Sequence, residues 1–386
     1  MSWSTVKLGD VCEIVMGQAP AGETYNNDNN GFPLIAGAGD FKNGIVDVKK
    51  FTTAPTKLSK IDDIVLSIRA SIGDKVWSNS IYCLGRGVAA LRVSAGLEKD
   101  YLWHTLSHVE KKLAAKAKGA TFKQVNREDI HSLKIPLPPL AQQKRIAAIL
   151  DKADEIKRKR EQAIAKLDQL AQSIFVEMFG DMVSNNKQWD DSKLLDDVAE
   201  IVSGITKGRK LNGATLRSIP YLAVLNVQDK SLNLSVIKTI EATEAEINRL
   251  LIRNNDLLLT EGGDADKLGR GTLWNNELPE CIHQNHIFRV RTTSNTISPR
   301  FLNWLIGSQR GKKYFLKSAK QTTGIASINM TQLKSFPLLL PPIALQEQFA
   351  TRISKLEKLK ASNIAALEKH NQLFASLQSQ AFTGQL

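Results

Sequence analysis

The fold is decided by residues 136–150, PLPPLAQQKRIAAIL, where a double proline opens a long amphipathic run. Because proline is tolerated in the first helical turn and forces the preceding residue into an extended conformation, Pro138 and Pro139 predict an abrupt change from strand to helix. We expect a helix of about 40 residues, which would extend roughly 60 Å at 1.5 Å per residue. Residues at alternating spacings of four and three form its heptad seam, which consists of Ile146, Leu150, Ala153, Lys157, Arg160, Ile164, Leu167, Ala171, Ile174 and Met178.

The same signal returns at residues 341–349, PPIALQEQF. Two such helices in one chain should pair as a coiled coil, and the second, which ends near the C-terminus, most simply runs antiparallel to the first. Both seams turn polar at their centres, where the residues either fix the register or mark a frayed, solvent-filled midpoint. The second seam consists of Phe349, Ile353, Leu356, Lys360, Asn363, Leu367, His370, Phe374, Leu377 and Ala381.

The sequence outside these two helices also occurs as two similar copies. Residues 7–17, KLGDVCEIVMG, return as residues 194–204, LLDDVAEIVSG, and shorter matches such as 63–67 with 256–260 keep the same order. The sequence therefore predicts an α+β fold with two similar mixed α/β domains, two long antiparallel coiled-coil helices between them, and an internal pseudo-twofold repeat. We place the domains at residues 1–138 and 184–341, and the two spacer helices at residues 139–183 and 342–386.

Each half shows the same succession of elements. Short β-branched and aliphatic runs between Gly, Asn and Asp predict strands at 64–68 and 88–93, and again at 257–260 and 287–290. Amphipathic helices are expected near Tyr101–Leu113 and Phe301–Leu316. A strand-like approach to each double proline is expected at Leu133–Leu137 and at Phe336–Leu340.

The charge of the chain favours a polyanionic partner. It carries 52 basic and 39 acidic side chains, a net charge of +13, and residues 281–346 contain no Asp or Glu at all. A solvated, lysine-rich surface is the alternative explanation. No apolar run is long enough for a membrane span, and the three cysteines lie far apart in the sequence, which suits a cytoplasmic protein without a metal site or a membrane partner.

In the double-proline runs and in the helix ends FGD (179–181) and FTGQL (382–386), the chain resembles the specificity subunits of type I restriction–modification systems. The run LLLTEGGD (257–264) also looks like a family signature. The resemblance implies two target-recognition domains that read double-stranded DNA. Because the two modules differ in sequence and a stiff helical spacer separates them, we expect the site that they read to be bipartite and asymmetric. The resemblance further implies helices that bind modification (methyltransferase) subunits, two of them expected, and a restriction motor-nuclease subunit.

Those partner subunits, and not this chain, would hold the cofactors: S-adenosylmethionine for adenine-N6 methylation, and ATP and Mg for restriction. The sequence agrees with a non-catalytic role, because it contains no Asn/Asp-Pro-Pro-aromatic run, no complete dinucleotide fingerprint and no phosphate loop. The run Asp264–Lys267 can be compared with part of a metal-dependent nuclease site, but its glycine-rich setting favours a turn. His283 and His286 lack the spacing of a zinc site.

The expected DNA contacts lie on polar loops at equivalent places in the two halves, where a solvated connecting loop is the alternative. Loops before each closing strand offer Lys116, Lys118, Thr121, Phe122, Lys123 and Gln124, and in the second half Lys320, Gln321, Thr322, Thr323 and Ser327. Loops after the central strands offer Arg69, Ser71, Lys267 and Arg270, and the loop after the first strand of the second half offers Lys207, Arg209 and Lys210. Trp77, Trp274 and Trp304 are expected in the core or as platforms.

Three alternatives remain open from the sequence. The first is a coiled-coil scaffold whose end domains bind protein, which would show only non-specific DNA affinity at moderate salt. The second is the recognition fragment of a single-chain restriction–methylase, which would need methyltransferase motifs that these residues do not contain. The third is a stand-alone specificity protein that no longer assembles with partner subunits.

Overall fold

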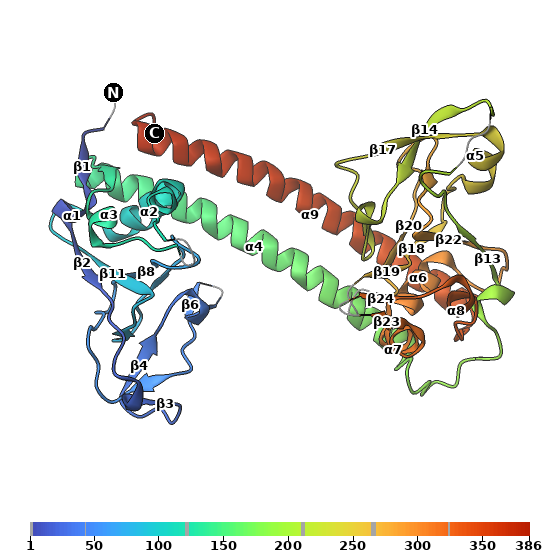
Figure 1. Cartoon of the computed structure of the whole chain (residues 1–386), viewed down its shortest axis with the longest axis horizontal. Helices are drawn as coiled ribbons and strands as arrows, with labels where there is room; N and C mark the ends of the chain where they lie inside the picture. Colours follow the sequence, from blue (N-terminus) through green and yellow to red (C-terminus); the bar gives the residue numbers. More distant parts are fainter. Residues whose placement is uncertain (1–2, 43, 120–122, 210–212, 264–267, 323–324) are drawn as a thin grey trace. The chain divides into compact units, whose positions relative to one another are not determined.

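The computed structural model describes residues 3–42, 44–119, 123–209, 213–263, 268–322 and 325–386. The chain forms two compact units: unit 1 comprises Met1–Gln162 and Asn363–Leu386, and unit 2 comprises Ala163–Ser362. Two long helices, α4 (Leu140–Phe179) and α9 (Ile343–Thr383), are each drawn as one uninterrupted coil in Figure 1. Each unit therefore holds one mixed module and a part of both helices.

Unit 1 is built on an antiparallel sheet in the order β2-β11-β8-β9 and a smaller sheet in the order β10-β4-β7-β3. Its strands are β1 (Thr5–Lys7), β2 (Cys12–Met16), β3 (Tyr25–Asn26), β4 (Phe32–Ile35), β5 (Phe41–Lys42), β6 (Ile45–Val46), β7 (Phe51–Thr52), β8 (Ile64–Ser67), β9 (Lys75–Trp77), β10 (Cys83–Leu84), β11 (Val88–Val93) and β12 (Lys134–Pro136). Its shorter helices are α1 (Leu8–Val11), α2 (Lys99–Ala115) and α3 (Arg127–His131).

Unit 2 repeats this plan, with one sheet in the order β13-β22-β18-β20 and another in the order β17-β14-β21. Its strands are β13 (Ala199–Ser203), β14 (Arg217–Leu222), β15 (Val227–Gln228), β16 (Ser231–Leu232), β17 (Lys238–Ala242), β18 (Leu257–Thr260), β19 (Gly262–Gly263), β20 (Gly271–Leu273), β21 (Ile282–His283), β22 (Ile287–Thr292), β23 (Lys320–Thr322) and β24 (Ile325–Ser327). Its shorter helices are α5 (Glu244–Leu250), α6 (Pro299–Gly307), α7 (Gln309–Ser318) and α8 (Met330–Lys334).

The central strands β8 and β18 each begin with three aliphatic residues, because both faces of these strands are covered. In β8, Ile64 and Leu66 join the core beneath α2, whereas Val65 between them joins the core on the other face. In β18, Leu257 and Leu259 point to one core and Leu258 to another. Alternate side chains of a strand point to opposite faces, so the run of aliphatic residues follows from a sheet that is buried on both sides.

Each long helix is anchored by aromatic and aliphatic packing at its ends. In unit 1 the beginning of α4 and the end of α9 share a core with α2, where Phe382 lies 5.7 Å from Tyr101 between ring centroids. In unit 2 the corresponding anchor near the end of α4 is Phe179, which lies 4.7 Å from Phe301 and 5.1 Å from Phe349. The equivalent use of Phe179 and Phe382 confirms the internal repeat.

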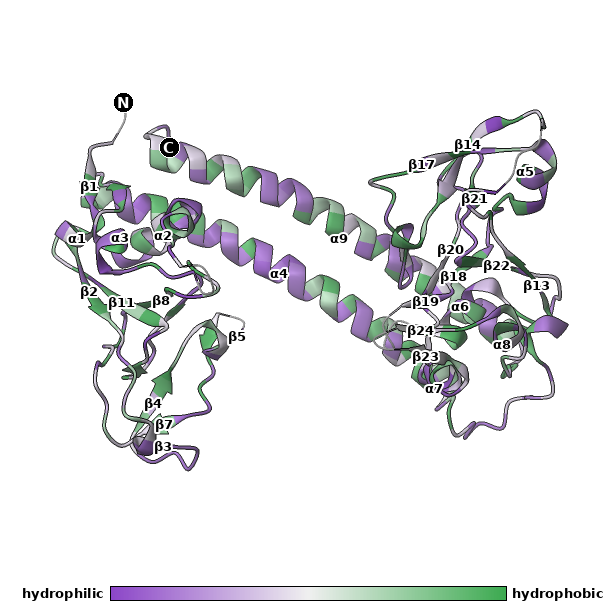
Figure 2. Ribbon diagram, in the orientation of Figure 1, coloured by the Kyte–Doolittle hydropathy of each residue, from purple (hydrophilic) through white to green (hydrophobic). Residues whose placement is uncertain are grey.

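The two helices run antiparallel within each unit. In unit 1 His370 Nε2 lies 2.7 Å from the carbonyl oxygen of Ala153, and in unit 2 Lys360 Nζ donates to Asp168 Oδ1 at 2.6 Å. Both helices alternate polar and apolar residues along their length (Figure 2). Lys360 is one of the polar residues at the centre of the seams, whereas His370 lies beyond that centre. That the polar centre fixes the register stays a prediction.

Two expectations about local structure were wrong. The helix expected at Phe301–Leu316 is interrupted at Ser308, which is extended and separates α6 from α7. This corner needs Gly311, because a Cβ there would lie 1.8 Å from the carbonyl oxygen of Ile306. The approach expected as a strand at Phe336–Leu340 forms only isolated bridges, such as Leu194 with Pro337.

A buried glutamine in the first turns of each long helix ties that helix to its own module. Gln143 Nε2 donates to the carbonyl oxygens of Gly96 and Pro138 at 2.8 Å each, and its Oε1 accepts from the Glu98 amide at 2.8 Å. Gln346 makes the same three contacts in unit 2, at 2.7 to 3.1 Å. The two glutamine side chains are 1% and 0% exposed, so each is a buried polar group whose hydrogen bonds all go to the backbone of its own module.

We predict that Gln143→Ala and Gln346→Ala each lower the free energy of unfolding by about 1 to 3 kcal/mol, because backbone donors and acceptors at the start of each helix lose their partner. Urea unfolding followed by circular dichroism measures the effect. Gln169→Ala, at an exposed position of α4, is the control and should change stability by less than about 0.5 kcal/mol. Equal stability of the Gln143 and Gln169 variants would contradict the structural role.

Candidate nucleic-acid interface

The structure brings the first two candidate loops of unit 1 together. Gln124 forms isolated bridges with Arg69, in the loop after β8, and with Lys118, in the loop after α2. The amide of Val125 donates to the carbonyl oxygen of Ile68 at 3.1 Å, which continues the pairing. The loop after the central strand and the loop before the closing strand therefore form one backbone frame.

The loop after β8, with Arg69, lines an open pocket of about 460 Å³. Arg69 Nε donates to Gln124 Oε1 at 2.7 Å, which fixes the guanidinium, and among the described residues its terminal amino groups have no hydrogen-bond partner. The other side chains that line the pocket include Ser71, Asp74 and Arg86. Within the described part of the chain, no carboxylate lies within ion-pair distance of Arg69 or Arg86.

Unit 2 builds the same frame with different residues. Strand β19 pairs with β24 so that Gly262 faces Ser327, and the Ile328 amide donates to the carbonyl oxygen of Glu261 at 2.9 Å. By this pairing Gly262 and Ser327 occupy the places of Arg69 and Gln124. A Cβ at Gly262 would lie 2.8 Å from the carbonyl oxygen of Ala326, so unit 2 has no room for a side chain where unit 1 carries an arginine.

Three basic candidates are held by partners within the protein. Lys116 Nζ donates to Ser132 Oγ at 2.8 Å and to the Asp129 carbonyl oxygen at 3.3 Å, so it joins the end of α2 to α3. Arg209 donates to both oxygens of Glu246, at 2.6 and 2.9 Å, and this hydrogen bonding lowers the pKa of the Glu246 carboxyl to about 2. Arg270 donates to Gln228 Oε1 at 3.3 Å. These contacts give each residue a local structural role, and a DNA contact by them stays a prediction.

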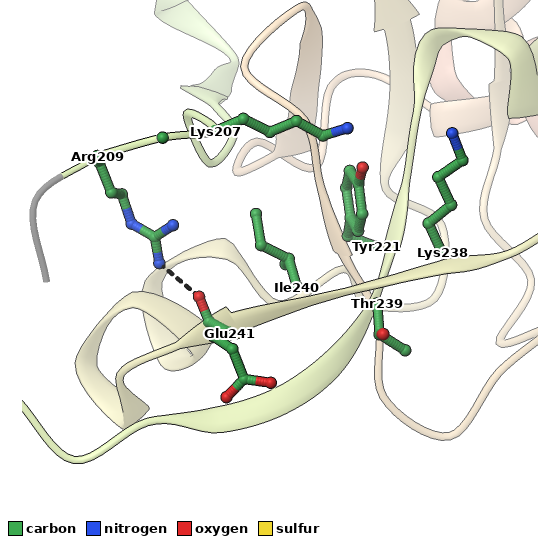
Figure 3. Close-up of a pocket in the computed structure, with 8 residues that line it drawn as sticks. Lys207, Arg209, Tyr221, Lys238, Thr239, Ile240 and Glu241 are labelled. Atoms are coloured by element: carbon green, nitrogen blue, oxygen red, sulfur yellow. Dashed lines mark hydrogen bonds between the residues drawn. The ribbon is translucent and has the colours of Figure 1, made fainter.

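Lys207 lines a second open pocket, of about 500 Å³, in unit 2 (Figure 3). Its ammonium lies 5.4 Å from the centroid of the Tyr221 ring, and Lys238 stands on the other side of that ring in Figure 3. Arg209 also lines the pocket, but a hydrogen bond of 2.8 Å to the Glu241 carbonyl oxygen holds it at one edge. Neither lysine has an ion pair with any described residue. Two unpaired ammonium groups at one pocket suit an anion such as a phosphate.

Of the remaining residues that were expected to contact DNA, some belong to the described ranges and some do not. Ser71, Lys118 and Lys123 are exposed, whereas Gln124 and Ser327 are half-buried within the frames. Lys320, Gln321 and Thr322 form strand β23 beside β24. Thr121, Phe122, Lys210, Lys267 and Thr323 lie outside the described residues, as does the whole run from Asp264 to Lys267.

The histidines and tryptophans of unit 2 have structural surroundings. His283 is fully buried, its Nδ1 lies 2.9 Å from the Ile287 carbonyl oxygen, and burial lowers its pKa to about 4. His286 Nδ1 lies 2.5 Å from Glu261 Oε2.

Trp274 and Trp304 are 1% and 6% exposed and belong to the core, as expected. Among the residues that can be described, no group of three or more His, Cys, Asp or Glu side chains is arranged to hold a metal ion.

Trp77, which was expected in the core or as a platform, is half-buried and stacks on Trp103 with 5.0 Å between ring centroids.

Arg86 and Lys238, which line the two pockets, were not among the DNA contacts expected from the sequence. Arg86 lies between Gly85 and Gly87, a pattern typical of an exposed turn that could have identified it. Lys238 begins strand β17, and only the pairing of β17 with β14 brings it next to Tyr221.

Two copies of one mixed α/β module, each tied to a pair of long antiparallel helices, define the class of protein. The sequence matches the family of the type I restriction modification DNA specificity domain twice, at residues 1–166 and at residues 186–369. The chain therefore belongs to the family of type I restriction–modification specificity subunits.

Individual relatives agree with this assignment. The putative MjaX specificity subunit of Methanocaldococcus jannaschii is 35% identical over 170 residues, which are 42% of this chain and 40% of that protein. The StySPI specificity subunit of Salmonella potsdam is 24% identical over 416 residues, which cover 100% of this chain and 89% of that protein. The crystal structure of the type I system S subunit from M. genitalium superposes with a TM-score of 0.60 at 15% identity, covering 99% of this chain and 96% of that one, which shows a shared fold.

None of the helices in the described ranges has an apolar stretch long enough to cross a bilayer. The cytoplasmic location expected from the sequence stays a prediction.

Proposed function

We propose that this chain reads a bipartite, asymmetric sequence on double-stranded DNA and thereby directs adenine-N6 methylation by partner subunits. The observation that carries the proposal is the pair of backbone frames at equivalent places. Each frame joins the loop after a central strand to the loop before α3 in unit 1 or α8 in unit 2. The frames are alike in backbone, but Arg69 and Gln124 in one stand where Gly262 and Ser327 stand in the other. Base edges are read by side chains. Because the two frames have the same backbone but carry different side chains, they support the reading of two different half-sites.

The helices support a fixed gap between the half-sites. Both α4 and α9 pass without interruption from one unit into the other, and polar contacts in each unit hold them in one antiparallel register. A fixed helical connection between two reading modules becomes a fixed number of base pairs between the sequences that they read, as half-site spacing does in symmetric dimers.

We further propose that the helices bind two modification subunits. Leu170 on α4 and Leu373 on α9 occupy corresponding positions of the repeat and are 47% and 55% exposed. A leucine left exposed at the same place on both helices supports two equivalent docking positions. In this proposal S-adenosylmethionine binds to the modification subunits, and ATP and Mg bind to a restriction motor-nuclease subunit, while this chain is a non-catalytic reader.

The proposal predicts one methylated motif of two unlike parts separated by a gap of constant length. Co-expression with the modification subunits, followed by sequencing of the DNA for N6-methyladenine, reveals the motif, and cells lacking only this chain are the control. Methylation at an uninterrupted or palindromic site would contradict the proposal. Absence of methylation, with only non-specific DNA affinity at moderate salt, would favour a protein-binding scaffold.

The pocket around Tyr221 generates a second prediction. If Lys207 and Lys238 each neutralise a phosphate, Lys207→Ala and Lys238→Ala should each reduce the slope of log affinity against log salt concentration by about one. Fluorescence anisotropy with a duplex containing the methylated motif measures this slope. Lys159→Ala is the control, because this lysine on α4 is already paired with Glu155 at 2.6 Å. A slope that changes equally in all three variants would rule out a phosphate contact at the pocket.

A further inference from the structure

The pocket of unit 1 is lined by a residue with a donor side chain and a residue with an acceptor side chain. Arg69 and Asp74 both line it, and they are not paired with each other, since no ion pair joins them among the described residues. The glycines at 37, 39 and 87 also line this pocket and leave its wall without side chains. Such a wall permits a close approach by a flat group.

The orientation of Arg69 is fixed before any ligand arrives. Its Nε is used by Gln124, and the backbone at the same residues is bridged, so the terminal amino groups form a fork at a defined place. The most common specific contact to guanine is made by an arginine whose two terminal amino groups donate to O6 and N7 in the major groove. Fixing the fork in advance reduces the entropy lost on binding.

The backbone next to Arg69 supports a functional role for this loop. Ala70 adopts a φ of +55°, a left-handed conformation that residues other than glycine rarely adopt. The equivalent residue of unit 2, Gly263, has a φ of 159°, which is nearly extended, so of the two equivalent loops the one in unit 1 turns left-handed at this place. Strain of this kind persists where the surrounding structure holds it, and it gathers at binding sites.

Asp74 decides between a base edge and a phosphate as the occupant. A carboxylate at the pocket repels a phosphate, which disfavours a purely electrostatic contact with the DNA backbone. It can instead accept a hydrogen bond from the exocyclic amino group of cytosine. A G·C base pair presents in its major groove the two acceptors of guanine beside the amino donor of cytosine, which is the complement of Arg69 and Asp74.

We propose that this pocket reads one G·C base pair in the first half-site, with Arg69 donating to guanine and Asp74 accepting from cytosine. Gln124 is a positioning residue that holds Arg69. The inference rests on the proposed function, because it names the base pair that one module reads. Unit 2 cannot use the same device, since Gly262 has no room for a side chain.

The test compares full-length variants in complex with the modification subunits, using selection from a randomised DNA duplex library and sequencing of the bound molecules. The unaltered protein should select a two-part motif with an invariant G·C pair in one part. Arg69→Ala should reduce discrimination at that pair by roughly tenfold or more and leave the other half-site unchanged. Asp74→Ala should weaken the same position by a smaller factor.

Two further variants separate base reading from charge and from folding. Arg127→Ala removes a charge at an exposed site close to Gln124, and it should leave every base preference unchanged even if affinity falls. Arg69→Lys keeps the charge but not the rigid fork, and it should retain less of the preference for guanine than the unaltered protein but more than Arg69→Ala.

Selection of the other half-site by the Arg69 variants serves as the internal control for folding and assembly. An Arg69→Ala protein that still selects the same G·C pair would overturn the inference while leaving the proposed function intact. Failure of the unaltered protein to select a two-part motif would overturn the proposed function, and the inference with it.

Discussion

The structure depends on the hydrogen bonds of two buried glutamines, Gln143 and Gln346. Each lies in the first turns of a long helix, where the double proline has changed the backbone from extended to helical, and each binds three backbone groups of its own module. Packing alone allows small slides and rotations, because apolar contacts are not directional. Hydrogen bonds to buried carbonyl and amide groups fix direction as well as distance, and an unmade one costs about 1 to 3 kcal/mol. The glutamines thus set the direction in which each helix leaves its module.

In the proposed function, the repeat also explains how one fold would read two different half-sites. Sheets, capped helices and glutamine contacts recur in both units, and so does the bridge between the central-strand loop and the loop before α3 or α8. What differs is the set of side chains on that bridge: an oriented arginine in one unit, and a glycine whose place is closed by a neighbouring carbonyl in the other. A constant backbone with exchangeable side chains keeps geometry and chemistry separate. Recognition can then change without disturbing the helices that join the modules.

Much of the fold could be predicted because local signals agreed with one another. The double proline places the start of α4 at Leu140, directly after Pro139, and the heptad seam carries that helix to Phe179. The break at Ser308 could not be predicted, because it depends on the packing of Gly311 against Ile306 and not on helix propensity. The candidate site was predicted only as separate loops. The contact between Arg69 and Gln124 joins residues 55 positions apart, and the sequence does not distinguish an arginine held by Glu246, such as Arg209, from one that is free to bind.

The central claim is that the two helices set the gap between the half-sites that the modules read. It is tested most directly by inserting one heptad into each helix at matched places, after Gln162 in α4 and after Ser362 in α9, and mapping the methylated motif. Seven residues add roughly 10 Å to a helix and keep its apolar face in phase, which corresponds to about three base pairs of duplex DNA. The account predicts that both half-sites stay the same while the gap lengthens by about three base pairs. An unchanged gap in an active, folded protein would contradict it.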